Sequence, residues 1–123
     1  MALDPTDLKA RKAVERLLIE DRDWAALEAF YGESESWNEL VRLLSTLTGT
    51  MKEPDVKVDL LLRTANIIEE RLEDTPRAER EYERVLEIDP KNANAARGLE
   101  PIYRANGKTQ NLRDVLELSL IHI

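Results

Sequence analysis

Apolar residues recur along the chain at spacings of three and four, which is the period of one face of an α-helix. The clearest run begins at Val58 and continues through Leu61, Leu62, Ala65, Ile68 and Leu72. Further runs of the same kind contain Leu8, Val14, Leu17 and Leu18; Ala78, Tyr82, Val85 and Leu86; Leu99, Ile102 and Tyr103; and Leu112, Val115, Leu116 and Leu120. No segment alternates apolar and polar residues with a period of two, so the pattern predicts an all-α protein.

Residues that start and stop helices lie between these runs. Start signals are Asp4-Pro5, the capping box Ser36-Trp37-Asn38-Glu39, Thr75-Pro76 and Asn92. In Thr75-Pro76, Thr75 is the predicted cap. Stop signals are Asp89-Pro90 and Asn106-Gly107, because the residue before proline avoids helix and glycine adopts a left-handed end easily. The stretch from Thr48 to Pro54 is poor in helix formers and is predicted to be a loop.

The helical pattern repeats. A shift of 72 residues superimposes Leu27, Glu28, Tyr31, Leu40 and Leu44 on residues of the same types at 99, 100, 103, 112 and 116. A middle copy lies between them, since Ala78 and Tyr82 precede Leu112 and Leu116 by 34 residues. Two helices in a unit of about 34 residues are typical of a helical solenoid.

With this repeat of two helices, the sequence resembles the tetratricopeptide repeat family. The middle unit carries the resemblance in Leu61, Ala65 and Ile68 of its first helix and in Ala78, Tyr82 and Val85 of its second. The closing sequence Leu86-Glu87-Ile88-Asp89-Pro90-Lys91-Asn92-Ala93 is similar to the turn between repeats of that family. The resemblance implies a right-handed α-solenoid of about three helix-turn-helix hairpins, preceded by one helix.

The expected domain is single and spans residues 1–123. A leading helix without a clear partner covers 5–21, and the three units cover 22–48, 56–90 and 92–121. The last residues, Leu118 to Ile123, are apolar except for Ser119 and His122. Because a terminal unit of a solenoid needs a polar outer face, we interpret the chain as a fragment of a longer array. The alternative is that this tail folds back against the last hairpin.

Charge and composition exclude several classes of protein. The chain has 18 Lys and Arg against 25 Asp and Glu, a formal net charge of −7, which disfavours nucleic acid and anionic membranes as partners. There is no cysteine, so disulfides and thiolate metal sites are excluded. We see no secretory signal and no apolar run of the roughly 20 residues that a membrane helix needs, and expect a cytoplasmic protein.

Catalytic chemistry finds little support in the residues. The single histidine, His122, lies near the end of the chain and has no obvious orienting partner. Glu69 and Glu73 stand one helical turn apart and could share a cation or act as acid and base, but we favour a solvated acidic face. We therefore predict no enzyme activity, no cofactor and no metal. The aromatic residues are interpreted as core, with a peptide contact of Trp24 as the alternative.

The candidate site is the surface that the first helices of the units share. Asp59, Leu62, Asn66 and Glu69 form one stripe of the middle unit, and Asn94, Arg97, Pro101 and Arg104 form one stripe of the third. By resemblance, both stripes face a concave groove that takes peptides. Asn66, Asn94, Arg97 and Arg104 are the predicted contacts, because Asn can bond a peptide amide and Arg can bond a carboxylate at two points. The alternative is that both arginines pair only with surface glutamates.

The sequence thus predicts an interaction module or adaptor. Its expected partner is a protein or peptide that is acidic or ends in a free C-terminal carboxylate. A structural spacer in a long repeat array and an accessory repeat region of a larger enzyme are the alternatives. We also expect self-association through the apolar C-terminal edge of Leu116, Leu118, Leu120, Ile121 and Ile123.

Overall fold

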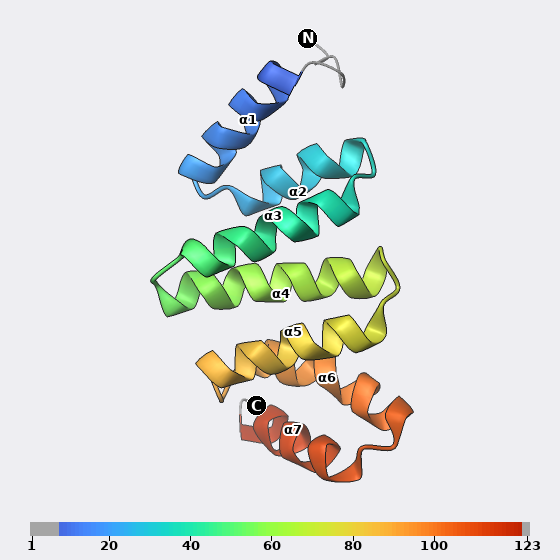
Figure 1. Cartoon of the computed structure of the whole chain (residues 1–123). Coiled ribbons are helices and arrows are strands. Elements are labelled where there is room, and N and C mark those ends of the chain that lie inside the picture. The colour runs from blue at the N-terminus through green and yellow to red at the C-terminus, as the bar shows by residue number, and fades with distance from the viewer. Residues whose placement is uncertain (1–7, 122–123) are drawn as a thin grey trace. The chain divides into compact units, whose positions relative to one another are not determined.

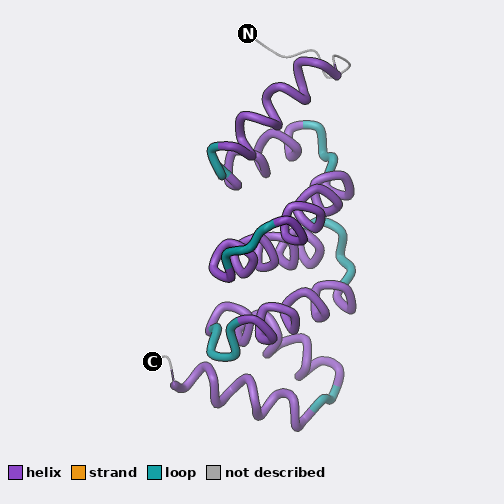
Figure 2. The backbone as a smooth tube through the Cα atoms, turned by 60° about the vertical axis from the view of Figure 1, so that its left-hand side comes forward, coloured by secondary structure: helices purple, strands orange, loops and turns teal. Residues whose placement is uncertain are grey.

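The computed structural model describes the backbone of residues 8–121 and the side chains of residues 9–117. Within that part of the chain every element is an α-helix, as Figures 1 and 2 show, so the predicted all-α class is confirmed. The helices are α1 (Leu8–Glu20), α2 (Trp24–Glu33), α3 (Trp37–Thr50), α4 (Pro54–Glu70), α5 (Thr75–Ile88), α6 (Ala93–Asn106) and α7 (Thr109–Ile121). The chain divides into two compact units, residues 1–40 and 41–123, and the boundary falls inside α3.

In the first unit, α1 packs against α2. The prediction of a leading helix without a partner is therefore wrong. The hydroxyl of Tyr31 on α2 donates a hydrogen bond of 2.9 Å to Glu15 on α1. The guanidinium of Arg11 lies 5.7 Å from the ring centre of Phe30 and 5.8 Å from that of Tyr31, so cation–π attraction also joins the two helices.

The core of the first unit forms around α2. Trp24, Leu27 and Tyr31 are buried there, at the spacing of one helix face, and Leu40 is buried at the start of α3. Trp24 is only 5% exposed, which places it in the core and leaves little indole surface for a peptide. Leu17 departs from the predicted apolar face, since its side chain is 60% exposed.

In the second unit, consecutive helices contact each other along the series α4, α5, α6 and α7. Helix α4 is buried along two stripes. One stripe, Leu61, Ala65 and Ile68, was predicted; the other, Leu60, Thr64 and Ile67, escaped the sequence pattern. The hydroxyl of Thr64 is satisfied by the carbonyl of Leu60 at 2.7 Å, so this polar residue is buried at little cost.

Most helix ends lie where the sequence places them. Asn92 caps α6 by accepting from the amide of Ala95 at 2.9 Å, and Gly107 ends α6 in the left-handed region, with φ 69°. Helix α5 ends at Ile88, before Asp89-Pro90. The cap of α5, however, is Asp74 rather than Thr75, because Asp74 accepts from the amide of Arg77 at 3.3 Å.

The two ends of α3 differ in how well the sequence predicts them. Helix α3 begins directly after Ser36 as predicted, and the Ser36 hydroxyl lies 2.9 Å from that of Ser34. The predicted loop from Thr48 to Pro54 is present but shorter, because α3 continues to Thr50 and α4 begins at Pro54, which leaves residues 51–53 as the loop. Thr48 and Thr50 each donate to a carbonyl within the preceding turn, at 2.7 and 2.8 Å, and these bonds accommodate the hydroxyl groups in the helix. The predicted cap Asp4-Pro5 lies outside the described residues.

The length and polarity of the helices bear on membrane insertion. Among those that the structure describes, none combines the length and apolar character needed to cross a bilayer.

Candidate binding groove

A cavity of about 480 Å³ opens in the second unit, and we call it the α4–α6 cavity after the helices that supply most of its walls. Its lining residues are Asp59, Leu62, Arg63, Asn66 and Glu69 of α4, Tyr82 of α5, and Asn94, Arg97 and Gly98 of α6. The whole predicted stripe of the middle unit is in this set. The cavity therefore brings the predicted stripe of α4 together with Asn94 and Arg97 of the predicted stripe of α6.

Helix geometry explains how α4 supplies one wall. Leu62, Asn66 and Glu69 follow each other at spacings of four and three, so their side chains leave the helix on the same side. The neighbouring stripe of Leu61, Ala65 and Ile68 is buried, which fixes the rotation of α4 about its axis. Burial of one face therefore determines which polar face remains available at the cavity.

Tyr82 of α5 contributes to the cavity although it is almost fully buried, with 3% of its surface exposed. Its hydroxyl donates a hydrogen bond of 2.8 Å to the side-chain oxygen of Asn66. That bond leaves the amide nitrogen of Asn66 as a hydrogen-bond donor. Burial, followed by the carboxylates of Glu69 and Glu70, raises the pKa of Tyr82 to about 12.

The ionisable side chains of the cavity differ in how well they are paired. Nε of Arg63 lies 3.1 Å from Asp59, one turn earlier on α4. Arg97 is exposed and makes no ion pair within the part of the chain that the structure describes. Burial, with the neighbouring charge of Glu70 as the second cause, raises the pKa of Glu69. The cavity thus combines an unpaired guanidinium, two asparagine side chains and a partly desolvated carboxyl group.

Not all of the predicted contacts reach this cavity. Asn66, Asn94 and Arg97 line it, whereas Arg104 is not among its lining residues. A guanidinium nitrogen of Arg104 lies 3.0 Å from Glu100, one turn earlier on α6. Arg104 therefore matches the alternative of a surface ion pair. Pro101 lies inside α6 and is exposed, and the helix continues past it to Asn106.

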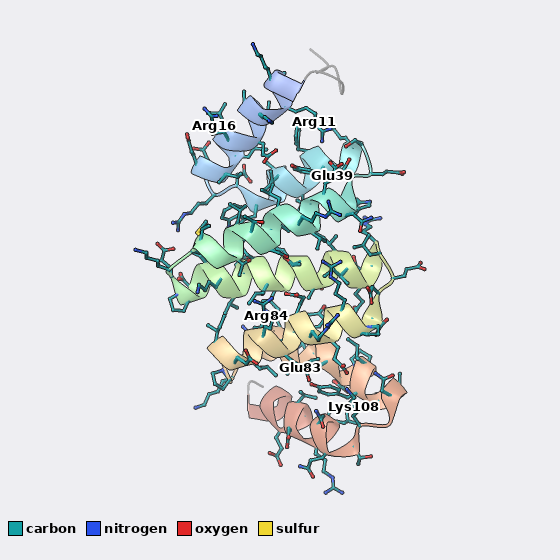
Figure 3. The ribbon with its side chains drawn as sticks, viewed as in Figure 1. Arg11, Arg16, Glu39, Glu83, Arg84 and Lys108 are labelled. Carbon is teal, nitrogen blue, oxygen red and sulfur yellow. The ribbon has the colours of Figure 1, made fainter. Side chains whose placement is uncertain are left out.

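A partly buried polar cluster joining α5, α6 and the turn before α7 was missed from the sequence. Nζ of Lys108 lies 3.0 and 3.1 Å from the two carboxylate oxygens of Glu79 and 5.8 Å from the ring centre of Tyr103. The hydroxyl of Tyr103 donates to Glu83 at 2.6 Å. Figure 3 marks Lys108 and Glu83 in this region. These partners are 20 and 29 residues apart, so no local pattern could have paired them.

The acidic run Glu69, Glu70, Glu73 and Asp74 spans the end of α4 and the turn before α5. Asp74 caps α5, and Glu73 lies in the preceding turn with φ 52°. Among the described residues, no group of three or more metal-ligating side chains is placed to hold an ion. His122, Ile123 and the side chains of Leu118, Leu120 and Ile121 lie outside what the structure describes. Leu116, the remaining member of the predicted apolar edge, is half-buried.

Comparison with known proteins identifies no relative. No family model matches the chain, and neither curated proteins nor solved structures show a significant similarity to it.

Proposed function

We propose that the α4–α6 cavity binds a segment of a partner protein that presents a carboxylate, either an acidic side chain or a free C-terminus. The observation that carries this proposal is Arg97, an exposed guanidinium without an ion pair among the described residues at the rim of a cavity of about 480 Å³. The helix pairs α4–α5 and α6–α7 would then act as two repeats of the tetratricopeptide type. In this proposal the same side chains bind the partner.

Three polar side chains of the cavity contact the ligand in this proposal. Arg97 donates two parallel hydrogen bonds to the carboxylate, for which its planar guanidinium is suited. The amide nitrogen of Asn66, held by the bond between its oxygen and Tyr82, donates to a backbone carbonyl of the ligand. Asn94 can both donate and accept, and so can pair with a peptide unit. Leu62 offers the ligand apolar contact.

Charge sets the range over which recognition acts. The chain carries a net charge of −7, so its long-range field repels an acidic ligand. Glu69 and Asp59 line the same cavity and disfavour a second carboxylate near them. We therefore expect short-range recognition of one carboxylate, with Arg97 supplying a charge-assisted bond worth about 1.5–3 kcal/mol.

The proposal is tested with a pool of fluorescent peptides that share a free C-terminal carboxylate, compared with the same pool amidated at the C-terminus. Fluorescence anisotropy measures binding to the wild type, Arg97→Ala and Arg104→Ala. The two variants remove the same charge from the same helix, and Arg104 serves as the control because it pairs with Glu100 outside the cavity. We expect Arg97→Ala alone to weaken binding by about tenfold or more. Equal binding by all three proteins rules out this site.

A further inference from the structure

The first unit repeats two structural features of the second. One is the turn between two helices, and the other is a hydrogen bond from a tyrosine of the later helix to the earlier helix. Arg22 and Glu73 both have positive φ, 54° and 52°, and each is followed by an aspartate that caps the next helix. Tyr31 donates to Glu15, and Tyr82 donates to Asn66; each acceptor lies 16 residues before its tyrosine. In all four correspondences the offset between the units is 51 residues. Helices α1 and α2 therefore match α4 and α5.

This match makes the face of α1 around Glu15 the counterpart of the α4 face around Asn66. A hollow of about 510 Å³ opens along that face of α1. Its lining residues, Lys12, Glu15, Arg16, Ile19 and Glu20, lie at the spacing of one helix face. Lys12 and Glu15 correspond to Arg63 and Asn66 of the α4–α6 cavity, whereas Ala13, Arg16 and Leu17 correspond to Thr64, Ile67 and Ile68, which are buried in the second unit. This face of α1 is therefore open where much of the matching face of α4 is covered.

The hollow is lined by two cations, Lys12 and Arg16, and two carboxylates, Glu15 and Glu20, whereas helix α1 as a whole is basic. Helix α1 contains four basic residues and two acidic ones, although the whole chain has a net charge of −7. Lys12 and Arg16 are exposed, and neither has an ion pair within residues 8–121. Glu15 is held by Tyr31 at 2.9 Å. In Figure 3 the side chain of Arg16 projects away from the ribbon of α1.

Apolar surface accompanies these cations. Leu17 follows Arg16 directly and is 60% exposed, and Ala13, one turn earlier, is also exposed. An exposed leucine beside two unpaired cations is complementary to an amphipathic helix that carries a stripe of carboxylates beside a stripe of apolar side chains.

We infer that this face of α1, defined by Lys12, Ala13, Arg16 and Leu17, is a second docking surface, which binds an acidic amphipathic helix of a partner protein. The carboxylates of the partner meet Lys12 and Arg16, and its apolar residues cover Leu17 and Ala13. This surface lies in the first unit and does not depend on the α4–α6 cavity.

The test uses a labelled synthetic helix with one face of glutamates and one of leucines, and a second peptide in which every glutamate is glutamine. Binding to the full chain is measured by fluorescence anisotropy at low and high salt. The variant is Lys12→Glu/Arg16→Glu. Its matched control is Arg80→Glu/Arg84→Glu, which has the same charge change and the same spacing on α5, with both residues exposed. Circular dichroism checks that both variants keep the wild-type helix content.

We expect the glutamate peptide to bind the wild type and the control alike, and Lys12→Glu/Arg16→Glu to bind at least about tenfold more weakly. The glutamine peptide and high salt should weaken binding to the wild type in the same direction. Arg97→Ala should leave this binding unchanged, which separates the result from that of the α4–α6 cavity. Equal loss in both double variants, or equal binding of the two peptides, overturns the inference. So does a concentration-dependent dimer in sedimentation that only Lys12→Glu/Arg16→Glu abolishes, because the occupant would then be a second copy of this chain.

Discussion

Gly98 of α6 lies directly against the ring of Tyr82 of α5. A Cβ atom placed on Gly98 would stand 2.5 Å from one ring carbon and 2.6 Å from the next, far inside van der Waals contact. The missing side chain therefore allows α6 to approach α5 while Tyr82 keeps its bond to Asn66. One glycine thus determines both the contact of the two helices and the shape of the α4–α6 cavity.

Gly98→Ala should accordingly destabilise the second unit. The ring of Tyr82 is buried and cannot move aside freely, so we expect a loss of about 1–3 kcal/mol in the free energy of unfolding. Urea denaturation followed by circular dichroism measures it. Gly49→Ala is the matched control, because a Cβ at Gly49 meets nothing within 4 Å and alanine is the better helix former. A Gly98→Ala protein as stable as the wild type would show that the ring is free to move.

The pair of Lys108 and Glu79 should stabilise the second unit more than an exposed ion pair does. The side chain of Glu79 is 11% exposed, so Lys108→Met would leave a largely buried carboxylate without its partner. We expect a loss of about 1–3 kcal/mol in the free energy of unfolding, and a smaller loss when Glu79→Met is added. Arg104→Ala, which breaks an exposed pair with Glu100, should cost only about 0.2–1 kcal/mol. Urea titrations of the four proteins test this order.

The sequence predicts the helices well because their causes are local. Asn92 and Gly107 act within one turn of their own positions, and the buried stripe of α4 follows from a spacing of three and four. Three of the four predicted groove residues line one cavity, Asn66 on α4 and Asn94 and Arg97 on α6. Spacing placed each of them on its helix face, but the expectation that the two faces meet came from the family resemblance. Arg104 does not line the cavity. It shares a stripe of α6 with Asn94 and Arg97, but that stripe does not determine how far the neighbouring helices extend along α6.

What the sequence could not predict depends on contacts between distant residues. The pairing of α1 with α2 rests on Tyr31 and Glu15, and the cluster at Lys108 rests on Glu79. The match between the two units at an offset of 51 residues lies in backbone angles and in hydrogen bonds, with only a few identical residues. Over residues 27–44, a shift of 72 residues superimposes more identical residues than a shift of 51 residues does, so this stretch of sequence alone favours the longer repeat.

High pH should destabilise the protein through its buried tyrosines. The pKa of Tyr82 is raised to about 12, and burial together with bonds to Glu15 and Glu83 raises those of Tyr31 and Tyr103 above their ordinary range. An unfolded tyrosine ionises near pH 10. Because the folded pKa is the higher one, the stabilisation is complete below pH 10 and is lost as the pH rises towards 12.

This dependence is measured in two ways. Absorbance near 295 nm should show the tyrosines ionising later in the folded chain than in guanidinium chloride. Urea midpoints should fall between pH 10 and pH 12, less steeply for Tyr82→Phe than for the wild type. If the three tyrosines titrate near pH 10 while circular dichroism remains unchanged, burial does not raise their pKa values and the prediction is wrong.

Helix α4 should be the most protected element of the chain, since it is buried along two stripes rather than one. Ala65 lies in one of them with no exposed surface, so Ala65→Leu should overpack the helix contact and cost about 1–3 kcal/mol. Native-state hydrogen exchange should find the slowest amides at positions 60–68 and faster exchange in α1, where Leu17 is exposed. Ala65→Leu should speed exchange in α4 and α5 and leave α1 nearly unchanged, because α1 belongs to the other unit. Slowest exchange at residues 8–20 would contradict this order.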